Sequence, residues 1–417
     1  MTDKQLTIGL FGFGVVGEGI YNVLKQTPSL NARVKTICIK HAWKKRNVSA
    51  ELLTTSYDAI LEDPEINVVV ELIDDADEAI KIVTKALQQK KAVVSANKKM
   101  IAEHLPELLS LQKEYETPFL YEAAVCGSIP VIRNLEEYYD NDMLQAICGI
   151  INGSTNFILT KIIDEGLGYK EALLLAQQQG FAESNPTLDV KGIDAANKLT
   201  ILLAHAYGIV TPPNKLLHIG ITQIRAEDAG LADEKNYKIK LTAQARKLST
   251  GAVAAFVLPQ FVTNESQLFY VKNEFNGVVI ESTLSDKQFI SGKGAGRYPT
   301  SSAVLSDISA LRYDYKYEYR KLNNVVKNLL TNDFYLKVYV SFDNWNDINR
   351  EDFEWLEEYH SNEKRQYLVG VIHFEKLKLC TWLYKDSVSL IVCPNGIIEN
   401  IELRKVQKRS LELAGIV

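Results

Sequence analysis

The sequence has few cysteines and no long apolar run. Its five cysteines, spread over 417 residues, form no Cys-x-x-Cys pair, which argues against a zinc site or a disulfide framework. No apolar stretch approaches the roughly 20 residues that cross a bilayer. The first residues, MTDKQLTIGLFGFG, lack a basic segment followed by an apolar core and a cleavage site. We therefore expect a cytoplasmic protein that has no membrane partner.

An excess of charge of one sign is also lacking. Lysine and arginine number 47 against 52 aspartates and glutamates, so the net charge is only -5. This balance gives no reason to expect a nucleic acid as partner. Hydrophobic residues make up 46% of the chain and charged residues 24%, which is typical of globular proteins. The length predicts two or three domains with sizeable cores.

The first third of the chain alternates apolar runs with amphipathic stretches. Apolar runs such as LTIGLFGF, RVKTICIK, INVVVELI, KAVVSA and FLYEAAV predict strands, and DEAIKIVTKALQQK predicts a connecting helix. Because these strands are continuously apolar, they predict a parallel, doubly wound sheet of the Rossmann type. From about Met143 the pattern becomes α+β. We interpret the polar and aromatic stretch RYDYKYEYRKLNN as a linker to a small C-terminal α/β unit. The predicted domains are 1–130, completed by a helix at about 297–315, then 131–296 and 319–417.

A glycine-rich turn follows the first predicted strand. GLFGFGVVGEG has the spacing G-x-G-x-x-G between a strand and a helix. In that context one glycine makes the turn, one lets the backbone approach a pyrophosphate, and one lets the helix close on the strand. The turn therefore predicts dinucleotide binding, the alternative being a purely structural turn. The predicted contacts are Gly12, Phe13, Gly14, Val15, Val16 and Gly17.

The end of the second predicted strand bears on the choice of cofactor. An acidic residue there would bind the ribose of NAD, but this chain has Lys40 within CIKHAWKKR. Basic side chains suit a 2′-phosphate, so the sequence favours NADP over NAD. The alternative is a solvated basic loop.

The stretch GFAESNPTLDVKGIDAANK places several acids before a lysine. Glu183 and Asp189 precede Asp194 and Lys198, which stand four residues apart at the start of an apolar helix and so share a face. The pair could be an ordinary surface salt bridge. The apolar character of the helix instead suggests a cleft, where the carboxylates would hold an ammonium group and a partly desolvated lysine could act in acid–base catalysis.

These residues belong to a longer pattern. AQQQGFAESNPTLDVKGIDAANK resembles the signature of homoserine dehydrogenases. The resemblance extends to GFGVVG, SANKK, YEAAVCGSIPVI, INGSTNFIL and GKGAGRYPTSSAVLSD, in the family's order over about the first 310 residues. It implies an NADP- or NAD-dependent oxidoreductase that interconverts L-aspartate 4-semialdehyde and L-homoserine, in threonine, methionine and isoleucine biosynthesis. A homodimer or homotetramer is expected. The alternatives are a dehydrogenase of another amino-acid semialdehyde and a non-catalytic dinucleotide-binding regulator.

The resemblance also implies roles for individual residues. Lys198 would exchange the proton with the substrate oxygen, Asp194 would orient lysine and substrate, and Lys98 would be a second catalytic lysine. The substrate pocket would comprise Glu183 and Asp189, which bind the amino end, with Phe181, Gly153 and Ser154. Ser95, Lys98 and Gly296 would contact the cofactor. A sodium or potassium ion would be held by Glu122, Val125, Gly127 and Ile129; the alternative for Glu122 is a capping or hinge carboxylate.

Two departures from the family pattern stand out. Asp74 and Asp75 replace glycines that the family usually has near the cofactor. The C-terminal unit has a periodicity like that of the family's ACT regulatory domain, but SFDNWNDIN replaces the loop by which such domains commonly bind amino acids. No kinase domain is expected.

Overall fold

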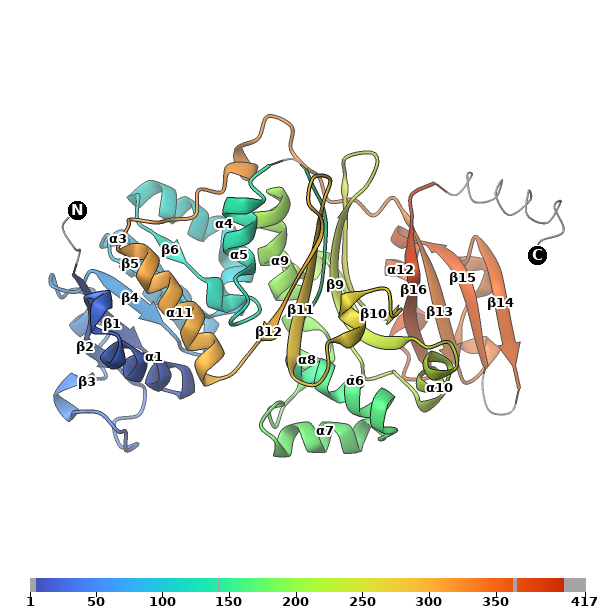
Figure 1. Cartoon of the computed structure of the whole chain (residues 1–417), viewed down its shortest axis with the longest axis horizontal. Helices are drawn as coiled ribbons and strands as arrows, with labels where there is room; N and C mark the ends of the chain where they lie inside the picture. Colours follow the sequence, from blue (N-terminus) through green and yellow to red (C-terminus); the bar gives the residue numbers. More distant parts are fainter. Residues whose placement is uncertain (1–4, 142, 363–365, 401–417) are drawn as a thin grey trace. The chain divides into compact units, whose positions relative to one another are not determined.

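A computed structural model describes residues 5–141, 143–362 and 366–400 of the chain (Figure 1). It divides into two compact units. Unit 1 comprises Met1–Met143, Asn197–Lys215 and Ile290–Lys327, and unit 2 comprises Leu144–Ala196, Leu216–Phe289 and Asn328–Val417. Each unit is therefore assembled from segments far apart in the sequence.

Unit 1 is built on a parallel sheet with the order β3-β2-β1-β4-β5-β6. All residues of β1 and β4 are buried, because both faces of the sheet are covered. This confirms the predicted Rossmann-type fold. The strands are β1 (Leu6–Phe11), β2 (Ala32–Cys38), β3 (Leu53–Thr54), β4 (Val68–Glu71), β5 (Ala92–Ser95) and β6 (Phe119–Leu120).

The helices of unit 1 include one from late in the chain. That helix, α11 (Arg297–Leu311), packs against α1 (Val15–Gln26), as Figure 1 shows. The Arg297 guanidinium lies 2.9 Å from the Glu18 carboxylate, and a side chain on Gly19 would collide with Ser301. The other helices are α2 (Asp58–Leu61), α3 (Ala76–Gln88), α4 (Lys98–Tyr115) and α5 (Val131–Arg133).

Unit 2 is built on a mixed sheet with the order β12-β11-β7-β9-β10-β16-β13-β15-β14, and β8 pairs with β10. Its strands are β7 (Leu144–Ile150), β8 (Leu217–His218), β9 (Lys238–Lys247), β10 (Val253–Val262), β11 (Phe275–Ser282), β12 (Asp286–Lys293), β13 (Tyr335–Phe342), β14 (Trp355–Ser361), β15 (Gln366–His373) and β16 (Val388–Ile398). The second half of β12, from Ile290, is assigned to unit 1. Its helices are α6 (Gly153–Glu165), α7 (Tyr169–Gln178), α8 (Thr187–Val190), α10 (Ala226–Glu234) and α12 (Phe374–Leu379). Helix α9 (Ile193–Tyr207) contributes its first turn to unit 2 and the remainder to unit 1.

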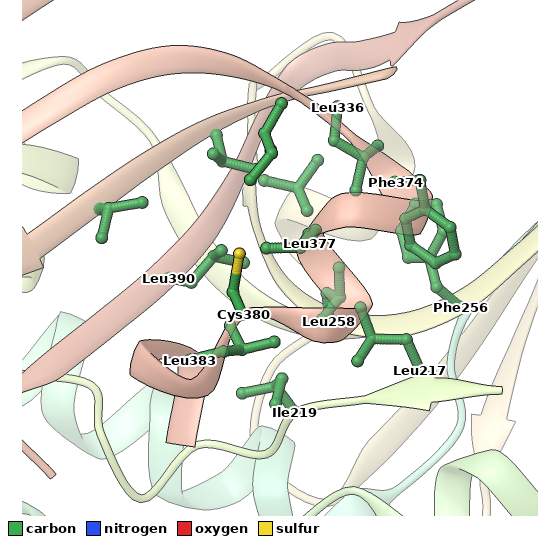
Figure 2. Packing of buried hydrophobic residues seen from close by; sticks show 14 of the residues in the cluster. Leu217, Ile219, Phe256, Leu258, Leu336, Phe374, Leu377, Cys380, Leu383 and Leu390 are labelled. Carbon is green, nitrogen blue, oxygen red and sulfur yellow. The ribbon is translucent and has the colours of Figure 1, made fainter. Parts of the chain in front are cut away.

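The C-terminal strands share a sheet and a core with the middle of the chain. β10 pairs in parallel with β16, where Gln260 lies opposite Val392. Phe256 and Phe374 lie in one hydrophobic cluster (Figure 2), with their ring centroids 5.7 Å apart. The ring of Phe334, in the same cluster, stacks on that of Phe256. The described residues between Asn328 and Asn400 thus group with the predicted substrate domain, whereas 319–417 was predicted from the sequence as a unit of its own. A single strand pairing between distant segments leaves no local sequence pattern that could reveal this continuity.

The prediction that RYDYKYEYRKLNN is a linker is wrong. Tyr317, Tyr319 and Lys321 are buried. The Tyr319 hydroxyl lies 2.5 Å from that of Tyr121, and the Lys321 ammonium donates to the Leu135 carbonyl at 2.6 Å. Buried Tyr317, Tyr319 and Lys321 alternate along the chain with exposed Glu318 and Arg320, so the overall composition of the stretch is polar although alternate side chains are buried.

Two strand assignments also change. In FLYEAAV only Phe119 and Leu120 form a strand, because Glu122–Ala124 makes a short 3₁₀ turn. The start of the glycine-rich stretch ISGKGAGRY belongs to strand β12, which the sequence analysis did not predict.

Candidate active site

The glycine-rich turn joins β1 to α1. Gly12 has φ +92°, and its amide donates to the Cys38 carbonyl at 3.0 Å. A Cβ on Gly17 would lie closer than 3.0 Å to the Gly12 carbonyl oxygen. Both positions therefore need glycine for the fold itself.

Gly14 is different because the protein does not fill the space beside it. It is the exposed N-cap of α1, has ordinary backbone angles, and would have nothing within 4 Å of an added Cβ. A helix N-terminus presents free amides to an anion. The open space at Gly14 is therefore where a pyrophosphate could approach the backbone.

The other predicted residues of this turn lie around the same helix start. Val15 is 60% exposed, the Phe13 ring contacts Tyr21 edge-on, and the Val16 carbonyl accepts from the Ser301 hydroxyl at 3.4 Å. Gly296 is exposed with φ +113° and is the N-cap of α11, a conformation that strongly favours glycine.

Ser95 lies at the carboxyl end of β5 in a hydrogen-bonded group. Its hydroxyl donates to the buried Glu71 carboxylate at 2.6 Å, and the Ile73 amide donates to the same carboxylate at 2.7 Å. Burial raises the pKa of Glu71 to about 7.

The Asn97 side chain caps α4 by accepting from the Met100 amide at 3.0 Å. Half-buried Lys98 is therefore the first residue of that helix.

The residues that depart from the family pattern have a local explanation. Asp75 is the N-cap of α3, and its carboxylate accepts from the Glu78 amide at 3.2 Å. Asp74 is exposed beside it. Capping by aspartate stabilises a helix start, so Asp75 has a structural role in this chain. Lys40 is exposed two residues beyond the end of β2.

Asp189 and Asp194, two of the predicted site carboxylates, meet at the start of α6. The Asn152 side-chain nitrogen donates to Asp189 at 2.6 Å and to Asp194 at 2.8 Å. Both acids are therefore held by one amide. The sequence analysis did not identify Asn152; it lies in the INGSTNFIL motif, directly before Gly153.

Phe181, Gly153 and Ser154 lie at the same helix start. The Ser154 hydroxyl donates to the Phe181 carbonyl at 2.6 Å, and a Cβ on Gly153 would lie 2.6 Å from the Glu274 carbonyl oxygen. Glu183 is exposed, and its backbone carbonyl accepts from Gln177 at 2.9 Å.

Asp194 and Lys198 occupy the first turns of α9. They are 4% and 7% exposed, so the alternative of a solvated pair on a helix surface does not apply. Burying charged groups is costly unless they are paired and hydrogen-bonded. Their placement at a buried helix start favours a functional reason.

Glu122 makes the contacts of a capping carboxylate. Its two oxygens accept from the Ile132 and Arg133 amides, each at 2.9 Å, at the start of α5. Burial and the neighbouring Asp307 charge raise its pKa to about 8. In the predicted cation-binding loop, Gly127 has φ +51°, and a side chain there would collide with the Gly294 carbonyl. Val125 and Ile129 are buried.

Among the described residues, no group of three or more His, Cys, Asp or Glu side chains could hold a metal ion. Within the same parts of the chain, no helix is long and apolar enough to cross a membrane.

Comparisons with known proteins identify relatives of both units. Residues 12–122 match the family model described as "Homoserine dehydrogenase, NAD binding domain", and residues 130–309 match "Homoserine dehydrogenase". The chain is 35% identical to the homoserine dehydrogenase of Bacillus subtilis over 317 residues, which cover 74% of this chain and 73% of that one. It is 36% identical to that of Synechocystis over 311 residues, 72% of each chain.

Solved structures extend the likeness to nearly the whole chain. A homoserine dehydrogenase from Thiobacillus denitrificans superposes with a TM-score of 0.82 at 28% identity, covering 94% of this chain and 98% of that one. A hyperthermophilic archaeal homoserine dehydrogenase mutant in complex with NADPH has a TM-score of 0.65 at 27% identity, covering 76% of this chain and all of that one.

Proposed function

The chain belongs to the homoserine dehydrogenase family, and from this premise we propose the roles of its individual residues. As a member it is an oxidoreductase that interconverts L-aspartate 4-semialdehyde and L-homoserine with a nicotinamide dinucleotide. The observation that best supports the proposed site is the joint placement of Asp189 and Asp194 on one buried amide at the start of α6.

When bound at the glycine-rich turn, the nicotinamide dinucleotide would supply the hydride for aldehyde reduction. Lys198 donates a proton to the substrate oxygen as negative charge develops there. Asp194, one helical turn earlier, orients the substrate and Lys198. Their burial excludes water from both groups, which strengthens the electrostatic interactions between them and the substrate.

Asp189 and Glu183 bind the ammonium group of the amino-acid substrate, and Ser154, Gly153 and Phe181 line the same pocket. An ammonium group offers three hydrogen-bond donors, which several carboxylates can accept. Lys98, at the start of α4, is the second catalytic lysine. Oriented binding of this kind lowers the entropic cost of reaching the transition state.

The dinucleotide binds at the turn Gly12–Gly17, near Ser95 and Gly296. We propose NADP as the preferred form, with Lys40 contacting the 2′-phosphate. The lack of an acidic side chain at the end of β2 supports this preference.

A monovalent cation is proposed at the loop that follows Glu122. The fit is partial, because both Glu122 carboxylate oxygens already accept backbone amides. The ligands would therefore be the carbonyl oxygens of Val125, Gly127 and Ile129, with Glu122 acting as the capping carboxylate of α5. Activity in sodium or potassium chloride, compared with tetramethylammonium chloride at equal ionic strength, tests this site.

Initial rates of NADPH and NADH oxidation with L-aspartate 4-semialdehyde test the function. We expect turnover with this aldehyde to exceed that with a panel of other amino-acid semialdehydes. A faster reaction with another member of the panel would replace the substrate assignment, and no turnover of any member would favour a regulator. The homodimer or homotetramer, which light scattering can test, and the cytoplasmic location stay predictions.

A further inference from the structure

Asn152 uses every hydrogen-bonding position of its side chain. It is 5% exposed and lies between β7 and α6. Its nitrogen donates to Asp189 and Asp194 at 2.6 and 2.8 Å. Its oxygen accepts from the Thr155 amide at 2.9 Å and from the Thr155 hydroxyl at 2.9 Å, and that hydroxyl also lies 3.1 Å from the Asn152 backbone carbonyl. A primary amide offers two donated hydrogens and two lone pairs, so this side chain is fully satisfied.

The three groups joined by this amide come from separate elements. Asp189 lies on α8, Asp194 on α9, and the capped Thr155 amide on α6. Each carboxylate is repelled by the other, and a neutral donor shared between them offsets that repulsion without adding charge. A hydrogen bond to the charged form of an acid is also stronger than one between neutral groups. The amide therefore fixes the spacing of two like charges.

The backbone around Asn152 is itself held in place. If the Asn152 side chain were removed, a small backbone movement could therefore not restore its hydrogen bonds to the two carboxylates. Gly153 packs so closely on the Glu274 carbonyl that no Cβ fits between them. Further along α6, the Asn156 amide donates to the carbonyls of Asn273 at 2.9 Å and Phe275 at 3.1 Å. The buried Lys240 ammonium donates to the Asn156 oxygen at 3.0 Å. The start of α6 is thus anchored on the 271–275 loop.

We propose that Asn152 is a positioning residue that holds Asp189 and Asp194 at the spacing needed to bind the substrate's ammonium group. It acts through the two carboxylates. The inference rests on the proposed function, because it takes Asp189 as a ligand of the substrate's amino end.

The competing explanation is that Asn152 only caps α6. The two roles separate in Asn152→Asp, because aspartate is as good an N-cap as asparagine but has no hydrogens to donate and adds a third negative charge. If capping were the whole role, both variants would change the thermal midpoint, Asn152→Ala through the lost cap and Asn152→Asp through the added charge, but neither would raise KM for homoserine.

The experiment measures kcat and KM for homoserine at saturating cofactor, KM for the cofactor, and the thermal midpoint. The variants are Asn152→Asp, Asn152→Ala, Asp189→Asn and the double variant Asn152→Ala with Asp189→Asn. Losing a charge-assisted hydrogen bond should raise KM for homoserine about 10- to 100-fold. We expect this for both Asn152 variants, with the cofactor KM within about twofold of wild type. If Asn152→Ala does not fold, Asn152→Asp still tests the proposal, because aspartate keeps the N-cap of α6.

The double variant tests whether Asn152 acts through Asp189. Residues that share one interaction show non-additive effects, so the double variant should raise KM by less than the product of the single effects. A wild-type KM in Asn152→Asp, or fully multiplicative effects, would overturn the inference. If Asp189→Asn keeps a wild-type KM, the assignment of Asp189 under the proposed function fails and the inference falls with it. A raised KM in Asp189→Asn beside a normal Asn152→Asp refutes the positioning role alone.

Discussion

Replacing Gly14 and Gly17 by alanine, one at a time, should separate what the glycine-rich turn does for the fold from what it does for the cofactor. An alanine methyl at position 17 would lie closer than 3.0 Å to the Gly12 carbonyl oxygen and 3.1 Å from its carbon. Backbone atoms cannot rotate away, so Gly17→Ala should cost about 1–3 kcal/mol of stability, as overpacking does. It should also weaken dinucleotide binding, because the turn must deform.

Gly14→Ala should leave stability within about 1 kcal/mol of wild type, the size of an N-cap effect. Nothing lies within 4 Å of the added methyl, and the backbone angles suit alanine. The methyl would nevertheless occupy the space in which a pyrophosphate approaches the helix start. Loss of charge-assisted hydrogen bonds worth about 1.5–3 kcal/mol corresponds to about 10- to 100-fold weaker binding.

The assays are thermal unfolding without cofactor and fluorescence titration with NADPH. The matched control is Gly168→Ala, because Gly168 is also an N-cap glycine with nothing within 4 Å of an added Cβ, and it lies in unit 2. It should match Gly14→Ala in stability and wild type in NADPH affinity. If Gly14→Ala bound NADPH as tightly as the control, the start of α1 would not be the phosphate site.

Three further predictions concern single side chains. Lys198→Ala should lower kcat by roughly 10²- to 10⁴-fold with little change in NADPH affinity, and steady-state turnover near wild type would end its catalytic assignment. Lys40→Asp should shift the ratio of kcat/KM for NADPH to that for NADH by about 10- to 100-fold; an unchanged ratio would mean a solvated loop residue. Glu71 has a pKa of about 7 against 4.5 for an unperturbed glutamate, so its contribution to stability is complete below pH 4.5 and is lost as the pH rises to 7. Glu71→Gln should reduce that decline by up to about 3 kcal/mol, as urea unfolding at both ends of this range would show, and an undiminished decline would contradict the raised pKa.

The features that the sequence predicted are those in which one local pattern decides the structure. The continuous apolar runs at β1 and β4 predicted strands in a sheet that is covered on both faces. Both strands are indeed fully buried in a parallel sheet. The G-x-G-x-x-G spacing between a strand and a helix is typical of a dinucleotide-binding turn. The apolar sides of α9 required burial, which also brought its charged start inside.

Asn152 shows what a local pattern could not reveal. Its partners are 37 and 42 residues away, and asparagine before a helix is explained well enough as an N-cap. The sequence offered one clue. If Asp189 and Asp194 lie in one cleft, their like charges call for a neutral hydrogen-bond donor between them. That reasoning requires the three-dimensional neighbourhood, since any of several polar residues could have supplied the donor.

The sequence predicts a separate C-terminal unit because strands and a helix recur after a polar stretch. In the structure, however, this segment shares a hydrophobic core with β10, so removing it would cost folding free energy. Val338 and Val340 of β13 lie in the same hydrophobic cluster as Phe256 and Leu258 of β10. Burying such side chains contributes about 1.5–3 kcal/mol each, so removing the chain after Asn332 would expose one side of the core beneath β10.

β10 also pairs with β9, and β9 supplies the Lys240 that supports the start of α6. A truncated chain would therefore lose activity whether or not the segment binds an effector. Threonine inhibition, which we expect to be weak because the usual effector loop is replaced by SFDNWNDIN, should be examined in the intact chain. Exposed Asp343 of that loop pairs with Arg225 at 2.6 Å. Substitutions on the exposed part of this loop can alter an effector response while leaving the shared core in place.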